Sequence, residues 1–255
     1  MMKKLIAAFL VAGAVVAQAD DSRSTASKIE VAPTAADKVP VKAKENSIAL
    51  GVTLTDGNSE TLLGTASFLH DRKRDGYSLR LGIDGAYAED KDETTTENVK
   101  GVAEYRKNLC ERSYILGNVS ALYDSIADVD YRVIVSAGPG YYLMKDDAAT
   151  LSVDLGPAFI TEKVGGETND DWALRVGQRY DRQLSATAKV WQALEYLPLI
   201  DDLDDYLLNA EIGIEAAVNS DVSLRLVVKN AYDSTPAADR EKSDTTVIGA
   251  LAYKL

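Results

Sequence analysis

From Ser47 to Leu255, apolar residues alternate with polar ones, so that hydrophobic side chains recur at every second position. A period of two is typical of β-strands that have one apolar and one polar face. In the segment 77–87, for example, apolar residues share one face while Arg80 and Asp84 occupy the other. We find no amphipathic helical pattern between these runs. The alternation therefore predicts an all-β fold over most of the chain.

The pattern predicts about twelve strands, an even number as in bacterial membrane barrels. Most of them reach about ten residues, which exceeds the five or six usual in soluble sheets. A tilted strand needs roughly 9–11 residues to cross a bilayer. The expected strands are 47–54, 60–70, 77–88, 98–109, 113–124, 131–144, 150–161, 172–181, 186–196, 206–218, 222–232 and 244–255.

The connections between these strands alternate in length after the first strand. Short periplasmic turns and longer external loops produce this alternation in antiparallel transmembrane β-barrels. The short connections are 72–76, 110–112, 145–149, 182–185 and 219–221. The longer connections include 89–97, 162–171, 197–205 and 233–243. We therefore expect a membrane barrel whose longer loops face outside.

Aromatic residues gather at both ends of the expected strands, on their apolar face. Tyr and Trp favour the boundary between membrane and water, because the ring is apolar while its polar tip stays hydrated. The loop-side belt contains Tyr87, Tyr123, Tyr131, Phe159, Trp172, Tyr196, Tyr206 and Tyr232. The turn-side belt contains Tyr77, Tyr141, Tyr180 and Tyr253. A soluble sandwich with inward tyrosines is the alternative, but it would not need two belts.

The N-terminal segment has the three parts of a secretory signal peptide. A positive stretch at 1–4 precedes an uncharged apolar run at 5–17, and Ala17-Gln18-Ala19 has the A-x-A form of a cleavage site. We expect a signal peptide at 1–19, a flexible periplasmic extension at 20–46 and an outer-membrane barrel at 47–255. A buried N-terminal helix is the alternative interpretation of the apolar run.

Three stretches carry a recognisable pattern, namely 49–61 (ALGVTLTDGNSET), 130–132 (DYR) and 138–143 (GPGYYL). Together they resemble the YdiY-like family of salt-induced outer-membrane proteins. The similarity extends over roughly the whole predicted barrel. It implies an outer-membrane location in a Gram-negative cell and a link to salt or envelope stress. The family has no known biochemical function, so it supplies no catalytic residues.

Charged residues on the polar face of the strands are candidates for lining the barrel lumen. A charge on the lipid face would cost about 2–4 kcal/mol at the membrane midplane, so segregation of charge to the other face favours a barrel. The candidate channel-lining residues are Arg80, Asp84, Lys100, Glu104, Arg106, Arg132, Asp154, Arg175, Arg179, Lys189, Glu195, Glu211, Glu215, Arg225 and Lys229. Bases outnumber acids in this set. It predicts a narrow porin-like channel with mild anion preference, or alternatively a salt-bridged plug that closes the lumen.

The longer loops are rich in acidic residues, as in Asp201-Asp202-Leu203-Asp204-Asp205. Carboxylate oxygens bind hard cations such as Ca²⁺, which could bridge these loops to lipopolysaccharide. Simple solvated charge is the alternative, since the sequence contains no D-x-D-x-D-G loop. We expect outer-membrane lipid, lipopolysaccharide and the barrel assembly machinery as partners, and we expect no bound metal and no cofactor.

Composition disfavours several other functions. The chain has 255 residues with 40 acidic and 28 basic side chains, giving a net charge of -12. This charge disfavours nucleic acid, which binds basic surfaces. Cys110 is the only cysteine, so an internal disulfide and a CxxC motif are impossible.

Catalysis is also disfavoured by the placement of the candidate groups. A hydrolase needs its nucleophile and base within hydrogen-bond reach. His70 is the only histidine, and the nearby Ser67 has the opposite parity, so the two should face apart. The Gly138-Pro139-Gly140 stretch lacks the following helix of a phosphate loop and is interpreted as a kinked or bulged strand.

Overall fold

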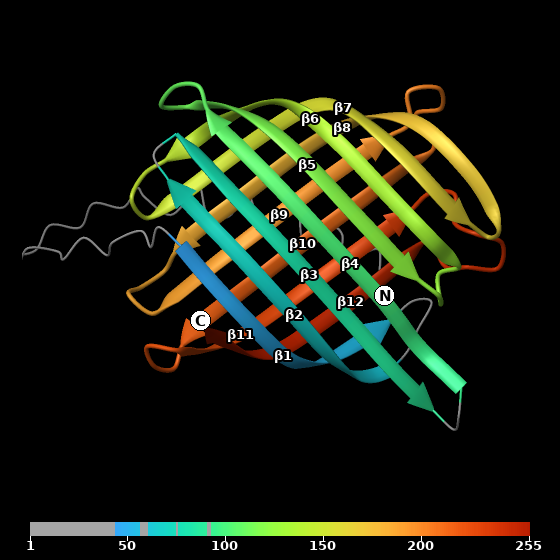
Figure 1. Cartoon of the computed structure of the whole chain (residues 1–255), viewed down its shortest axis with the longest axis horizontal. Coiled ribbons are helices and arrows are strands. Elements are labelled where there is room, and N and C mark those ends of the chain that lie inside the picture. The colour runs from blue at the N-terminus through green and yellow to red at the C-terminus, as the bar shows by residue number, and fades with distance from the viewer. Residues whose placement is uncertain (1–43, 57–60, 75, 91–92) are drawn as a thin grey trace, which may run out of the picture. The chain divides into compact units, whose positions relative to one another are not determined.

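The computed structural model describes residues 44–56, 61–74, 76–90 and 93–255, and within them twelve antiparallel strands form a closed barrel (Figure 1). This confirms the predicted fold class. The expected signal peptide and most of the expected extension lie outside the described residues. The strands are β1 Lys44–Asp56, β2 Thr61–Arg74, β3 Tyr77–Asp90, β4 Glu93–Asn108, β5 Ser113–Asp124, β6 Val129–Lys145, β7 Ala149–Val164, β8 Glu167–Gln183, β9 Ala188–Pro198, β10 Tyr206–Ala217, β11 Val222–Asp233 and β12 Ser243–Lys254.

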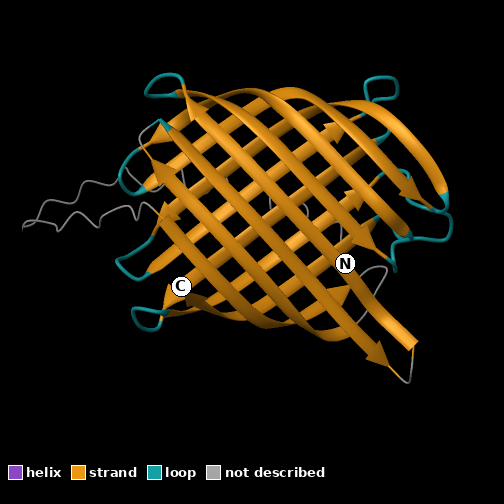
Figure 2. Ribbon diagram, in the orientation of Figure 1, coloured by secondary structure: helices purple, strands orange, loops and turns teal. Residues whose placement is uncertain are grey.

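Each strand pairs with its neighbours in sequence, and β1 pairs with β12 to close the barrel. The closing ladder extends from Ser47 opposite Lys254 to Asp56 opposite Thr245. Closure pairs the first described strand with the last, so this sheet lacks the free edge strand through which open sheets aggregate. Figure 2 shows the described chain as strands and loops. No helix in this part of the chain is long and apolar enough to span a membrane.

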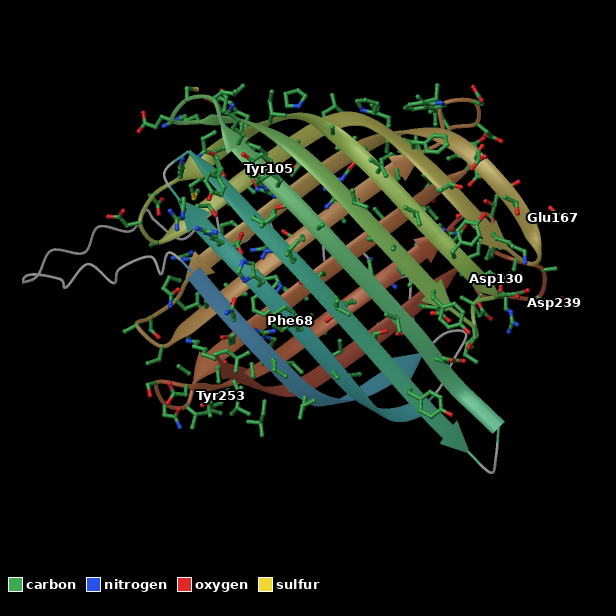
Figure 3. The ribbon with its side chains drawn as sticks, viewed as in Figure 1. Phe68, Tyr105, Asp130, Glu167, Asp239 and Tyr253 are labelled. Atoms are coloured by element: carbon green, nitrogen blue, oxygen red, sulfur yellow. The ribbon has the colours of Figure 1, made fainter. Side chains whose placement is uncertain are left out.

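We name the two ends of the barrel by their connections. The turn end holds 109–112, 146–148, 184–187 and 218–221, together with the start of β1 and the end of β12. The loop end holds 125–128, 165–166, 199–205 and 234–242. In Figure 3, Asp130, Glu167 and Asp239 lie together at the loop end.

The wall separates apolar from polar side chains, as the alternation predicts. On the outer face, large hydrophobic side chains such as Leu50, Ile83 and Leu226 are at least half exposed. On the inner face, polar side chains such as Arg106, Asn118 and Ser223 are buried. An inverted distribution of this kind is stable when lipid surrounds the outside.

Several strands extend further at the loop end than the sequence predicted. Glu89 and Glu93 belong to β3 and β4, so strand covers most of the expected loop 89–97. In the β7–β8 hairpin, Val164 pairs with Glu167. Gly165 and Gly166 have φ of 60° and 82°, as a two-residue hairpin turn requires. The predicted long loop 162–171 is therefore wrong, and its acidic residues lie mostly on paired strands.

The β6–β7 ladder is interrupted where two Gly-Pro dipeptides face each other. Register pairs flank the gap on both sides, and Gly138 lies opposite Gly156 within it. A Cβ atom on Gly138 would lie 2.1 Å from the carbonyl oxygen of Leu155. Pro139 and Pro157 lack an N–H and cannot donate to the ladder. The predicted kinked strand is thus a strand with an unpaired, closely apposed segment.

Candidate functional site: the barrel lumen

The structure places the predicted lining residues on the inward face of their strands. They come from β3 (Arg80, Asp84), β4 (Lys100, Glu104, Arg106), β6 (Arg132), β7 (Asp154), β8 (Arg175, Arg179), β9 (Lys189, Glu195), β10 (Glu211, Glu215) and β11 (Arg225, Lys229). Contacts between strands that are not neighbours in the wall demonstrate this orientation, since such contacts must cross the interior. The ion pairs of Arg132 with Asp233 and of Lys229 with Asp84 are two of them.

At the loop end, one arginine is held between two carboxylates. Arg132 Nη2 donates to Asp233 Oδ2 at 2.7 Å, from β6 to β11 across the lumen. Its Nε donates to Glu162 on the adjacent β7. All three side chains are at most one-fifth exposed. This group carries one net negative charge and connects opposite walls.

Near the middle of the lumen, Arg175 also binds two carboxylates. Arg175 donates through Nε to Glu195 on β9 at 2.7 Å and through Nη1 to Asp154 on β7. Tyr114 on β5 donates its hydroxyl to Asp154 at 3.3 Å, and Asn209 on β10 donates to Glu195 at 3.3 Å. The network joins β5 to the four strands β7 to β10, and Arg175 and Asp154 are buried within it.

A second central group spans the lumen around Lys229. Its Nζ lies 3.3 Å from Asp84 on β3 and 3.9 Å from Glu211 on β10. Trp191 on β9 donates from its indole N–H to Glu211 at 2.6 Å. Lys100 stands directly opposite Asp84 in register, but forms no ion pair with any residue that the structure describes.

At the turn end the arrangement is reversed, because one carboxylate is held by two bases. Glu215 accepts hydrogen bonds from Arg225 Nε at 2.9 Å and from the Ser223 hydroxyl at 3.0 Å. Lys189 Nζ lies 3.6 Å from the same carboxylate. This group carries one net positive charge.

Three further turn-end pairs each join one arginine to one carboxylate at 2.8 Å. Arg80 pairs with Asp71 across strands. Arg106 pairs with Glu104 and Arg179 with Asp181, in each case two residues away on the same strand. Side chains two residues apart share one face of a strand, so these pairs lie along the wall.

Four inward carboxylates that bind predicted arginines are not among the lining residues predicted from the sequence. They are Asp71, Glu162, Asp181 and Asp233. Asp71, Glu162 and Asp233 lie at strand ends beyond the expected boundaries, whereas Asp181 is the last residue of the expected strand 172–181. Their charges remove the excess of bases on which the predicted anion preference rested.

Inward glycines let large side chains lie flat on the wall. Gly140 is in register with Tyr114, and a Cβ there would lie 2.2 Å from the tyrosine ring. Gly213 is likewise in register with Trp191, and a Cβ there would lie 2.1 Å from the indole ring. These glycines therefore keep two bulky rings close to the wall instead of across the lumen.

One side of the lumen carries an apolar cluster. Its buried members come from β6 to β10, and Leu199 packs against them from the 199–205 loop. They are Ile134, Ala158, Ile160, Ala173, Leu197 and Leu207. The cluster gives that side of the interior a hydrophobic core, which the alternating pattern alone did not identify.

The 234–242 loop extends from β11 toward other loop-end connections. The Thr235 hydroxyl donates to Asp205 Oδ1 at 2.6 Å, and Tyr206 N donates to the Ser234 hydroxyl at 2.7 Å. Farther along, a Cβ on Gly165 would lie 3.4 Å from Ala237 Cβ. The loop thus spans from β10 to the β7–β8 turn, on the loop-end side of the lumen.

The remaining candidates stay apart from the lumen network. His70 Nδ1 lies 2.6 Å from Asn46 Oδ1, while Ser67 faces the opposite side of β2, as predicted. Cys110 is exposed in the β4–β5 turn, and its hydrogen bond with Ser113 lowers the pKa of the thiol. Within the described residues, no cluster of three or more His, Cys, Asp or Glu side chains could hold a metal ion.

Comparisons with known proteins identify a matching family and a relative of similar sequence. Residues 48–255 match a family described as "Protein of unknown function, DUF481". The uncharacterized protein YdiY of Escherichia coli (strain K12) is 23% identical over 166 residues, which cover 64% of this chain and 64% of that protein. The match therefore spans slightly less than two thirds of that relative.

Solved barrels share the fold at low identity. The NanC porin has a TM-score of 0.56 at 8% identity, covering 82% of this chain and 100% of that one. The KdgM porin has a TM-score of 0.48 at 12% identity, covering 82% and 99%. The first similarity supports the barrel architecture described above.

Proposed function

Because the chain belongs to the DUF481 family of proteins of unknown function, as the resemblance to YdiY-like proteins indicated, we propose its function from its own structure. We propose that it is an outer-membrane β-barrel that forms a narrow channel for ions or small solutes. The observation that carries this proposal is the lumen, whose charged side chains are paired along and across a closed wall.

The outer surface supports insertion into a bilayer. Aromatic rings pair on the outer face near both ends of the barrel, where the two membrane boundaries would lie. At the loop end, Tyr206 stacks on Tyr232 with ring centroids 5.6 Å apart. At the turn end, Tyr77 and Tyr105 lie 5.9 Å apart. Exposed apolar side chains between these rings, such as Ile83 and Leu226, would then face the hydrocarbon region.

The interior supports conduction through a narrow path. Charged groups inside a barrel retain contact with water, and several here do so, since Asp84 and Lys229 are 46% and 33% exposed. Glycines beneath Tyr114 and Trp191 leave space that these rings would otherwise occupy. A barrel of about twelve strands falls between packed eight-stranded barrels and open porins of sixteen or more.

A non-conducting structural or surface-interaction barrel is the second candidate. The apolar cluster between β6 and β10 and the cross-lumen bond of Arg132 to Asp233 favour it, because both fill space within the lumen. In this alternative, exposed acidic residues at the loop end bind cations or lipopolysaccharide. The barrel then contributes to the envelope through its surface.

Location and conduction can be tested separately. We expect the protein in the outer-membrane fraction, with a gel mobility that changes on heating as folded barrels do. Recovery as a soluble periplasmic protein would refute the membrane assignment. For conduction, vesicles containing the barrel should release small ions but retain oligosaccharides. Retention of every solute by correctly folded barrels would favour the structural alternative.

The proposal also covers export of the protein, its insertion into the outer membrane and its induction by stress. The family resemblance supports export through a cleaved signal peptide, insertion by the barrel assembly machinery and induction by salt or envelope stress. Protein levels should therefore rise when cells are shifted to high salt. Unchanged levels would remove the stress assignment while leaving the barrel assignment intact.

A further inference from the structure

Two groups of charged side chains inside the lumen carry net charges of opposite sign. At the loop end, Arg132 is outnumbered by Glu162 and Asp233. At the turn end, Glu215 is outnumbered by Arg225 and Lys189. The lumen therefore begins with net negative charge at one end and net positive charge at the other.

Other inward residues at the loop end extend the negative charge. The strand register places further carboxylates on the lumen face, and Asp171 lies within electrostatic range of Asp205, Asp201 and Asp170. The added lumen-facing acids are Asp124, Asp171 and Asp244. Among the described strand residues, Arg132 is the only base on this end of the lumen face, and in the 234–242 loop Arg240 and Lys242 are matched in number by Asp239 and Glu241.

Inward residues at the turn end extend the positive charge. Each inward carboxylate there whose side chain the structure describes has an arginine partner, as Asp71 has Arg80 and Asp181 has Arg179. Several lysines share this end of the lumen face without being needed for those pairs. The register places Lys73, Lys145 and Lys254 in this set. The turn end consequently has more bases than acids.

Opposite fixed charges at the two ends of a narrow pore make conduction depend on the direction of the field. When the loop side is positive, cations enter through the acidic end and anions through the basic end, so mobile ions accumulate in the lumen. When the voltage is reversed, each ion must enter through an end of its own sign, and the lumen is depleted. Fixed charge acts on ions this strongly where the pore is no wider than the Debye length.

We infer that the channel is a rectifier that passes more current when its loop side is positive. The inference rests on the proposed channel function and assigns to it a preferred direction for inorganic ions. The central groups add no positive charge that would oppose it, because Lys229 and Arg175 each lie against two carboxylates. The difference in charge along the lumen therefore arises at its loop end and its turn end.

Current–voltage curves of single channels test this inference. In about 0.1 M KCl, where the Debye length is about 10 Å, the current with the loop side positive should exceed the current at the opposite voltage. In about 1 M KCl the Debye length is about 3 Å, and the two currents should converge. Biotin on Cys110, followed by streptavidin in one compartment, identifies the turn side through block of the current.

Charge variants show whether the named residues are responsible. Lys145→Gln combined with Lys189→Gln should reduce the current ratio toward one, as should Glu162→Gln combined with Asp233→Asn. Lys107→Gln is the matched control, because it removes one exposed base from the outer face at the turn end. It should leave the ratio unchanged.

The possible outcomes separate this inference from the proposed function. A folded barrel that never conducts would refute the channel itself. A conducting barrel with equal currents at both polarities in dilute salt would overturn the rectifier and keep the channel. A larger current with the turn side positive would also overturn it. Rectification that survives both charge variants would contradict the residue assignment.

Discussion

Arg132 on β6 and Asp233 at the end of β11 are joined by a 2.7 Å hydrogen bond that crosses the loop end of the lumen. The two strands are not neighbours in the wall. Because both side chains are mostly buried, their attraction is screened less than that of a surface pair. The contact links two distant strands and occupies the loop end of the lumen.

The Arg132–Asp233 contact should appear as an energetic coupling. We expect Arg132→Ala and Asp233→Asn to be non-additive, with a coupling of about 0.5–3 kcal/mol in the free energy of unfolding. A double-mutant cycle by urea unfolding in detergent micelles measures it. Additive effects would show that the contact contributes nothing. Glu162 remains unchanged in all four proteins.

Removal of Arg175 should destabilise the barrel strongly. Arg175→Ala leaves the carboxylates of Asp154 and Glu195 without their common partner, at a cost of about 3–5 kcal/mol. The urea midpoint should fall accordingly. Lys189→Ala is the comparison, because Lys189 is 38% exposed and should cost no more than about 1 kcal/mol. Equal effects of the two substitutions would contradict the network described here.

Gly138 should not tolerate a side chain. In Gly138→Ala, the new Cβ meets the Leu155 carbonyl at 2.1 Å, and we expect a loss of about 1–3 kcal/mol or failure to fold. Gly117→Ala is the matched control, since nothing lies within 4 Å of a Cβ there. The heat-dependent gel shift reports the folded fraction. Folding of both variants in equal yield would argue against the close β6–β7 approach.

A charge on the outer face should be costly if lipid surrounds the barrel. Leu226 is half exposed and lies near the middle of β11, so Leu226→Arg should cost about 2–4 kcal/mol in a bilayer. Ser220→Arg in the β10–β11 turn places the same charge in water and should be nearly neutral. Unfolding from lipid vesicles measures both. A tolerated Leu226→Arg would contradict the membrane assignment.

Shortening the 234–242 loop should widen the loop end. Replacing residues 236–240 by two glycines removes Ala237, which lies against the β7–β8 turn. We expect larger single-channel conductance, because less protein then spans the mouth. Ser220→Ala at the opposite end is the control for a change in a connection. Unchanged conductance would mean that this loop lies outside the conducting path.

Alternation predicted the strands because each residue of this wall has one of two environments. Outward-facing Leu50 and Leu226 and inward-facing Arg106 and Arg175 follow it closely, so the fold class and the inward side chains could be predicted. The lengths of the hairpins could not be predicted. Polar residues beyond the apolar band, such as Glu167, form backbone strand pairs but leave no alternating hydrophobic pattern in the sequence.

The partners in the inward ion pairs could not be predicted from the sequence either. Parity places Asp84 and Lys100 on one face, and register makes them neighbours, yet Asp84 pairs across the lumen with Lys229. Which base pairs with Asp84 depends on the curvature of the barrel and on the lengths of the side chains. Asp233 shows the same limit, because it falls at the very end of a strand and its partner lies on a distant strand.

Single-channel conductance of the folded barrel in a planar bilayer tests the central claim most directly. A heat-dependent gel shift first verifies that the sample is folded. We predict discrete conductance steps, small in size because paired side chains occupy much of the lumen. Folded, inserted barrels that remain silent at every voltage would contradict the channel and leave a plugged, structural barrel in its place.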